Sequence, residues 1–233
     1  ATFIAEWFAL LMGLAICFAL SQNFPKIIWT LIFSRTKIIT ILLVNRDIFL
    51  RSLMVEMIFV SFLMTSGKFG DVELAATQIL LQFLHISSYG MDGFAFAAEV
   101  LVGQAVGKSN RFMLRDAVIK SALWTFVIAI FLALIYALYG SFLIKIMTTS
   151  DEVIFAAEAF LIFIVLGPIF GALPFLMDGI FVGATRSIDM RNMMFVSLII
   201  YVVSAYVFIN LYGFYGLWLA LLVSYAARGI SLV

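Results

Sequence analysis

Cysteine, histidine and proline are scarce in this 233-residue chain, which has one cysteine, one histidine and three prolines. The single Cys17 can form no internal disulfide and is expected to be a small packing residue. With His85 as the only histidine, we expect neither a metal cluster of ordinary spacing nor a serine–histidine–acid arrangement with a nucleophile elbow. The sequence therefore predicts a protein that is not an enzyme and that holds no cofactor.

Charged residues are also scarce, at 12% of the chain, whereas 65% of the residues are apolar and the mean hydropathy is +1.19. Water-soluble domains of this size do not have such a composition, so the sequence predicts an all-α, polytopic membrane helix bundle. Windows of about 19 residues give the expected transmembrane helices. There are seven of them, at residues 1–24, 48–66, 72–106, 118–147, 153–183, 192–212 and 213–230.

Two of these stretches are longer than a simple span. The stretch 72–106 would be about 50 Å long at 1.5 Å per residue, so it must tilt, bend or project, and Gly90 and Gly93 are where it could bend. The stretch 153–183 is predicted to be kinked or broken at its helix-disrupting residues. These residues are Gly167, Pro168, Gly171 and Pro174.

The basic residues cluster at alternate connections between the predicted helices, and the positive-inside rule makes that side cytoplasmic. The chain is therefore expected to lie in a membrane, the bacterial inner (plasma) membrane, with its C-terminus in the cytoplasm. The chain begins at Ala1 within an apolar run and without a basic leader, which favours the start of a fragment over a processed product. The cytoplasmic set is Lys26, Arg35, Lys37, Arg46, Arg51, Lys108, Arg111, Arg115, Lys120, Arg186, Arg191 and Arg228, which leaves Lys68 and Lys145 outside.

A polar stripe runs along the third predicted helix at steps of four, three, four, three and seven residues. On an α-helix these steps keep the side chains on one face, with a drift of about 20° per heptad. A charged residue at mid-membrane costs roughly 2.5 to 3.5 kcal/mol, so such a row favours a water-filled cavity on a substrate or ion pathway. Its members are Gln78, Gln82, His85, Tyr89, Asp92 and Glu99.

The tripeptide Met91-Asp92-Gly93 in the third helix recurs as Met177-Asp178-Gly179 in the fifth. We expect Asp92 to belong to the pathway, where it could titrate or coordinate a cation. Asp178 is open to two interpretations, a pathway role or an interfacial pair with Arg186 or Arg191. Glu56 is a weaker pathway candidate, and His85 is either a packed polar group or a proton relay.

Other polar and small residues are given structural roles. Asn45, Arg46, Asp47 and Arg51 are expected to form a structural polar knot where the second helix enters the membrane. Glycines four residues apart let helix backbones approach closely. They occur at Gly103 and Gly107, Gly167 and Gly171, and Gly179 and Gly183.

Several separated blocks of this sequence resemble the multidrug and toxic compound extrusion (MATE) family, in particular its DNA-damage-inducible F-like branch. They are NRDIFLR at 45–51, YGMDGFA at 89–95, DGIFVGATR at 178–186 and GLW at 216–218. The resemblance implies a twelve-helix transporter of two six-helix lobes that exports organic cations or amphiphiles in exchange for protons or sodium. This chain would be its sixth helix and C-terminal lobe.

On that basis residues 1–24 are a transmembrane helix that precedes the lobe, residues 25–47 a cytoplasmic connection between lobes, and residues 48–233 the six-helix lobe. The expected partners are membrane lipid, a small cationic or amphiphilic substrate and the missing N-terminal lobe, and no nucleic acid. The expected mechanism is alternating access. A flippase for lipid-linked substrates, or a non-transporting scaffold or fragment, remain as alternatives.

Overall fold

A computed structural model describes residues 2–20 and 33–232 of the chain. The chain divides into two units, Ala1–Leu42 and Leu43–Val233, which are described separately. The first unit contains the apolar helix α1 (Thr2–Leu20) and the start of α3. The part of the predicted interlobe connection at residues 25–32, including Lys26, lies outside the described residues.

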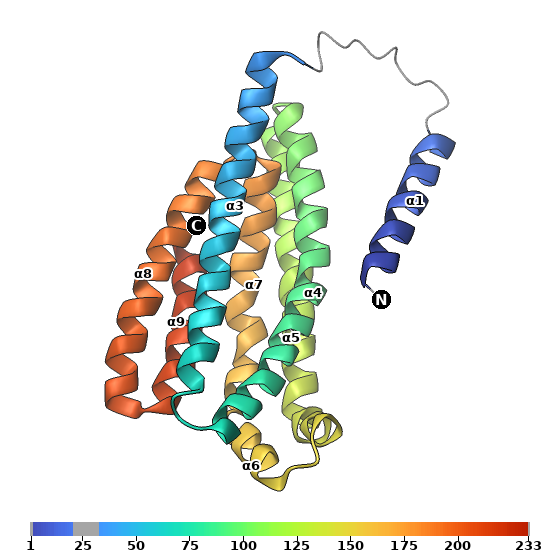
Figure 1. Cartoon of the computed structure of the whole chain (residues 1–233). Coiled ribbons are helices and arrows are strands. Elements are labelled where there is room, and N and C mark those ends of the chain that lie inside the picture. The colour runs from blue at the N-terminus through green and yellow to red at the C-terminus, as the bar shows by residue number, and fades with distance from the viewer. Residues whose placement is uncertain (1, 21–32, 233) are drawn as a thin grey trace. The chain divides into compact units, whose positions relative to one another are not determined.

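The second unit is a bundle of α-helices, and the described residues contain no strand. Its helices are α3 (Arg35–Ser66), which begins in the first unit, α4 (Asp71–Gly107), α5 (Arg111–Met147), α6 (Asp151–Ala159), α7 (Leu161–Gly183), α8 (Ser187–Tyr212) and α9 (Phe214–Ser231). The α4–α5 and α7–α8 connections lie at one end of this bundle, and the α3–α4, α5–α6 and α8–α9 connections at the other (Figure 1). The predicted all-α membrane bundle is confirmed.

By length and composition, five helices of the described chain could cross a membrane: α3, α5, α7, α8 and α9. The sequence predicts seven, and the two others correspond to α1 and α4. In α1, Phe3–Ala19 form a shorter apolar helix. The 37-residue α4 is long enough but contains the polar stripe, which makes it less hydrophobic than a helix that faces lipid on all sides.

The long helices differ in detail from the prediction. Helix α4 continues without a break through Gly90 and Gly93. The stretch 153–183 is interrupted at Phe160, between α6 and α7, and Pro168 and Pro174 lie inside α7. Phe160 is buried among aromatic rings, with centroids 4.6 Å from Phe214 and 6.1 Å from Trp218. No glycine or proline marks this position in the sequence. We attribute the break instead to the packing of Phe160 among aromatic rings.

Close packing between α4 and α7 depends on glycine. A Cβ atom on Gly179 would overlap the carbonyl oxygen of Ala95, and a Cβ atom on Gly183 would overlap that of Glu99. The predicted close approach of helices is therefore confirmed at these two positions. It is wrong at Gly107, where a Cβ atom would meet nothing within 4 Å.

Candidate functional site

The polar stripe of α4 divides into two parts. Gln78, Gln82 and Tyr89 are exposed on the surface of the lobe, and Tyr89 keeps 75% of its area accessible. His85, Asp92 and Glu99 are partly buried. The division follows from the helical drift, because Asp92 and Glu99 have rotated furthest from Gln82 around the helix axis.

The exposed part of the stripe borders a recess. Gln78 and Gln82 line an open recess of about 330 Å³ together with Thr148, Met147 and Val153 from the α5–α6 connection and its flanks. Its volume lies near the lower end of the roughly 300–1,000 Å³ typical of ligand pockets. Amide side chains on an apolar wall can orient a ligand by hydrogen bonds without the desolvation cost of a full charge.

His85 packs against an aromatic ring instead of another titratable group. Its imidazole centroid lies 5.8 Å from that of Phe59 on α3. Within residues 2–20 and 33–232, no three His, Cys, Asp or Glu side chains come together as a metal site would require. The ring contact supports the packed polar interpretation of His85 over the proton relay.

Asp178 on α7 is the centre of a buried ion cluster. It is 8% exposed and accepts hydrogen bonds at Oδ2 from Arg51 on α3 and from Arg228 on α9. Its Oδ1 and the Nε of Arg51 are buried and have no hydrogen-bond partner within the described part of the chain. We call Arg51, Asp178 and Arg228 the inner cluster, and it joins three helices that are far apart in the sequence.

The pairing predicted for Asp178 is wrong. Arg186 instead pairs with Asp189 at 2.7 Å, and Arg191 pairs with Asp47 at 2.6 Å. Asp178 is buried inside the helix bundle and does not lie at the membrane–water interface. Its partners are therefore the inward-facing arginines of α3 and α9.

Asp92 lies beside the inner cluster but does not join it. It interacts electrostatically with Asp178, Arg51 and Arg228, yet it forms no salt bridge with any residue that the structure describes. With Asp92 ionised, the four groups have no net charge, because two guanidinium groups face two carboxylates. Neutralising Asp92 would leave one positive charge uncompensated at this place.

The predicted polar knot consists of two separate groups. Asp47 is 1% exposed and binds Arg46 at 3.1 Å, Arg191 at 2.6 Å and the hydroxyl of Ser187 at 3.4 Å. We call Asp47, Arg46 and Arg191 the outer cluster. Arg51, one turn further along α3, belongs to the inner cluster instead.

Two other predicted residues lie outside these clusters. Asn45 and Glu56 are exposed and make no hydrogen bond or ion pair with the described residues. Sequence reasoning missed Arg228 of the inner cluster, and it did not place Arg191 with Asp47 in the outer cluster. A buried arginine in an apolar helix is itself a signal that an acidic partner lies nearby, and that signal could have identified Arg228.

Comparisons with known proteins agree with this architecture. The model of the MatE family matches residues 48–207. DNA damage-inducible protein F of Escherichia coli (strain K12) is 33% identical over 238 residues, which cover 100% of this chain and 50% of that protein. The chain thus spans about half the length of this relative.

A solved structure has the same fold. It is that of a MOP superfamily transporter from Pyrococcus furiosus Vc1 (DSM3638), which is described as having a binding pocket of reverse polarity that suggests a different function. The TM-score is 0.74 at 13% sequence identity, and the match covers 83% of this chain and 43% of that one.

Proposed function

The chain belongs to the MATE family of transporters, and on this premise we propose that it supplies one lobe of a secondary active exporter. Its cargo would be organic cations or amphiphilic drugs, exchanged for protons or sodium by antiport with alternating access. Because the chain spans about half of its relative DNA damage-inducible protein F, the other half of the pathway would come from an N-terminal lobe.

The single observation that carries this proposal is the environment of Asp92. It is a partly buried carboxylate on a helix that runs the length of the lobe, and it is not tied to a basic partner among the described residues. A carboxylate held in a salt bridge cannot readily gain or lose a cation, whereas Asp92 can. We assign it the role of binding and releasing the coupling ion.

The exposed residues of the α4 stripe would contact the cargo. Gln78, Gln82 and Tyr89 offer hydrogen bonds and an aromatic face on the surface of the lobe, and an aromatic face attracts organic cations. Glu99 and Glu56 would add negative charge along the route. Asp178 is excluded from direct cation binding in this proposal, because Arg51 and Arg228 already neutralise it.

The orientation follows from the basic residues of the bundle. The α4–α5 and α7–α8 connections lie at the same end (Figure 1). Arg186 lies in the second of these connections, and the starts of the helices that follow, α5 and α8, carry Arg111, Arg115 and Arg191. We place this end in the cytoplasm of a bacterium, with the bundle in the inner membrane. Each net charge that crosses the membrane in one exchange is worth about 2.3 kcal/mol per 100 mV, whereas an exchange of one coupling ion for one monovalent cation moves no net charge and is driven by the ion gradient alone.

The test is transport by the full-length protein in proteoliposomes that are loaded with a fluorescent organic cation. A pH gradient and a sodium gradient are imposed separately, and release of the dye is followed in the wild type and in Asp92→Asn. We expect gradient-driven release by the wild type and at least a tenfold loss in the variant, since the coupling group is neutralised.

The matched control is Asp116→Asn, which removes a carboxylate that pairs with Lys120 at the surface of α5. It is expected to transport as the wild type does. Equal gradient-driven release by Asp92→Asn and the wild type would remove Asp92 from the mechanism. Absence of release by the wild type, together with movement of a fluorescent lipid between leaflets, would favour a flippase.

A further inference from the structure

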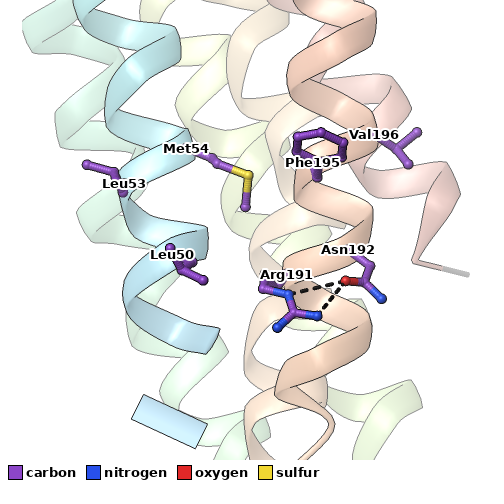
Figure 2. Close-up of a pocket in the computed structure, with 7 residues that line it drawn as sticks. All are labelled: Leu50, Leu53, Met54, Arg191, Asn192, Phe195 and Val196. Atoms are coloured by element: carbon purple, nitrogen blue, oxygen red, sulfur yellow. Dashed lines mark hydrogen bonds between the residues drawn. The ribbon is translucent and has the colours of Figure 1, made fainter. Parts of the chain in front are cut away.

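A groove lies between α3 and α8, on a different side of α3 from the contact between Phe59 and His85. It has a volume of about 440 Å³ and lies next to the α7–α8 connection. Leu50, Leu53 and Met54 line it from α3. Arg191, Asn192, Phe195 and Val196 line it from α8. Figure 2 shows the polar pair at one end and the apolar side chains extending away from it.

The described residues do not use all the hydrogen-bond donors of Arg191, at the polar end of the groove, or of Arg46, which shares Asp47 with it. Arg191 donates through Nη1 to Asp47, and through Nε and Nη2 to the side-chain oxygen of Asn192. Arg46 donates to Asp47 through Nε and Nη2. A guanidinium has five N–H donors, so both side chains keep donors available for another acceptor.

The charges at this end of the groove are also unbalanced. The outer cluster contains two guanidinium groups and one carboxylate, so it has a net charge of +1. The carboxylate is buried, with 2% of its side chain exposed, whereas the side chain of Arg46 is 55% exposed. The surplus positive charge therefore faces the outside of the bundle and can attract one monoanionic group.

The remainder of the groove is apolar and accessible. Leu53 is 46% exposed, Phe195 is 55% exposed and Val196 is 41% exposed. These residues belong to two helices that are long and apolar enough to cross a membrane. An occupant therefore has a single anionic group next to Arg46 and Arg191, and a hydrocarbon chain that follows the helices into the membrane.

We propose that this groove binds one anionic phospholipid of the bilayer. The phosphodiester accepts hydrogen bonds from Arg46 and Arg191, in the bidentate manner that guanidinium groups favour. One acyl chain lies against Leu50, Leu53, Phe195 and Val196. Basic pockets between transmembrane helices bind lipid headgroups in this way.

The first test fills the apolar part of the groove. The full-length protein is exchanged into mixed micelles with equal amounts of phosphatidylglycerol and phosphatidylcholine, and the bound lipids are counted by native mass spectrometry. We expect the wild type to retain phosphatidylglycerol five- to tenfold more than phosphatidylcholine. Val196→Trp should reduce the retained phosphatidylglycerol at least fivefold, because the indole occupies the position of the acyl chain.

Val203→Trp is the matched control, since Val203 is also an exposed valine of α8, 57% accessible, and lies two turns beyond the groove. It is expected to retain lipid as the wild type does. Equal retention by Val196→Trp and Val203→Trp would overturn the groove as the binding site. Equal retention is also the result expected if another part of the protein covers the groove, in which case no lipid binds there.

The second test removes the surplus charge without opening the pair between Arg191 and Asp47. Arg46→Gln should bring phosphatidylglycerol retention down to that of phosphatidylcholine. Arg186→Gln, which removes an exposed arginine that is paired with Asp189 at the same end, should leave the preference unchanged. Equal preferences in both variants, or no preference in the wild type, would overturn the recognition of an anionic headgroup.

Discussion

The same tripeptide, Met-Asp-Gly, has different surroundings in α4 and in α7. In α7, Asp178 is held by Arg51 and Arg228, and a Cβ atom on Gly179 would overlap the backbone of α4. In α4, Asp92 has no salt bridge with the described residues, and a Cβ atom on Gly93 would meet nothing within 4 Å. Identical local sequence thus gives a structural carboxylate in one helix and an available one in the other.

The difference arises from the neighbouring helices and not from the tripeptide. Asp178 points to the side where α3 and α9 each contribute an arginine, whereas Asp92 lies at the margin of the same cluster. A buried carboxylate between two guanidinium groups holds its helices together, because removing either partner leaves a buried charge uncompensated and lowers the free energy of unfolding. We expect the same substitution to change stability by different amounts in the two copies and, at the glycine, in opposite directions.

The largest effect is expected for Asp178→Asn. The amide keeps the shape of the side chain but leaves two guanidinium groups close together with only the unbonded carboxylate of Asp92 near them, which costs about 3–5 kcal/mol in the free energy of unfolding. The measurement is unfolding of the full-length protein in mixed micelles with increasing denaturant. Asp189→Asn, which loses only a surface pair with Arg186, should cost less than about 1 kcal/mol. Comparable losses in the two variants would show that the inner cluster does not stabilise the lobe.

The second effect is expected for Gly179→Ala. The added methyl group meets the carbonyl oxygen of Ala95, so α4 and α7 must move apart, at a cost of about 1–3 kcal/mol. The same unfolding experiment measures the loss. An unchanged unfolding midpoint would mean that α4 and α7 can move apart at no cost, which would contradict their close packing at Gly179.

Gly93→Ala is the corresponding substitution in the α4 copy of the tripeptide, and we expect it to raise the free energy of unfolding instead of lowering it. A helix interior prefers alanine to glycine by roughly 0.5–1 kcal/mol, and open space surrounds this position. The variant should therefore unfold at a slightly higher denaturant concentration. A loss as large as that of Gly179→Ala would indicate that this face of α4 packs against a part of the protein beyond the described residues.

The smallest effect on stability is expected for Asp92→Asn, at less than about 0.5 kcal/mol. Asp92 makes no salt bridge with the described residues, and repulsion from Asp178 offsets part of its attraction to Arg51 and Arg228, so little is lost when the charge is removed. A loss close to that of Asp178→Asn would make Asp92 a member of the inner cluster. In that case the contrast between the two copies would disappear.

Features that repeat along one helix could be predicted from the sequence. The apolar stretches locate the helices, and the steps between Gln78 and Glu99 predict the polar face of α4, including the drift that separates its exposed and half-buried members. The glycine spacing predicts the close approach of α4 and α7 at Gly179 and Gly183. All of these depend only on helical periodicity.

The ion partners could not be predicted, because they depend on how distant helices pack. Arg51 and Asp178 are 127 residues apart, and Arg191 and Asp47 are 144 residues apart. Charge and spacing favour nearby partners such as Arg186, which in fact binds its own helix neighbour Asp189. Similarly, the break at Phe160 follows from rings contributed by α9, and the prolines of α7 do not mark it.

The attachments of α3 determine how this half of the protein can move. From Leu43 onward, α3 is joined to α8 through Asp47 and to α7 through Arg51, whose partner Asp178 also binds Arg228 of α9. The edge contact of Phe62 with Trp218, 4.8 Å between centroids, joins α3 to α9 directly. In the proposed alternating-access cycle we therefore expect α3 to move together with α8 and α9. Spin labels on α3 and α9 should keep a constant separation throughout the proposed transport cycle, while labels in the two proposed lobes report the opening and closing.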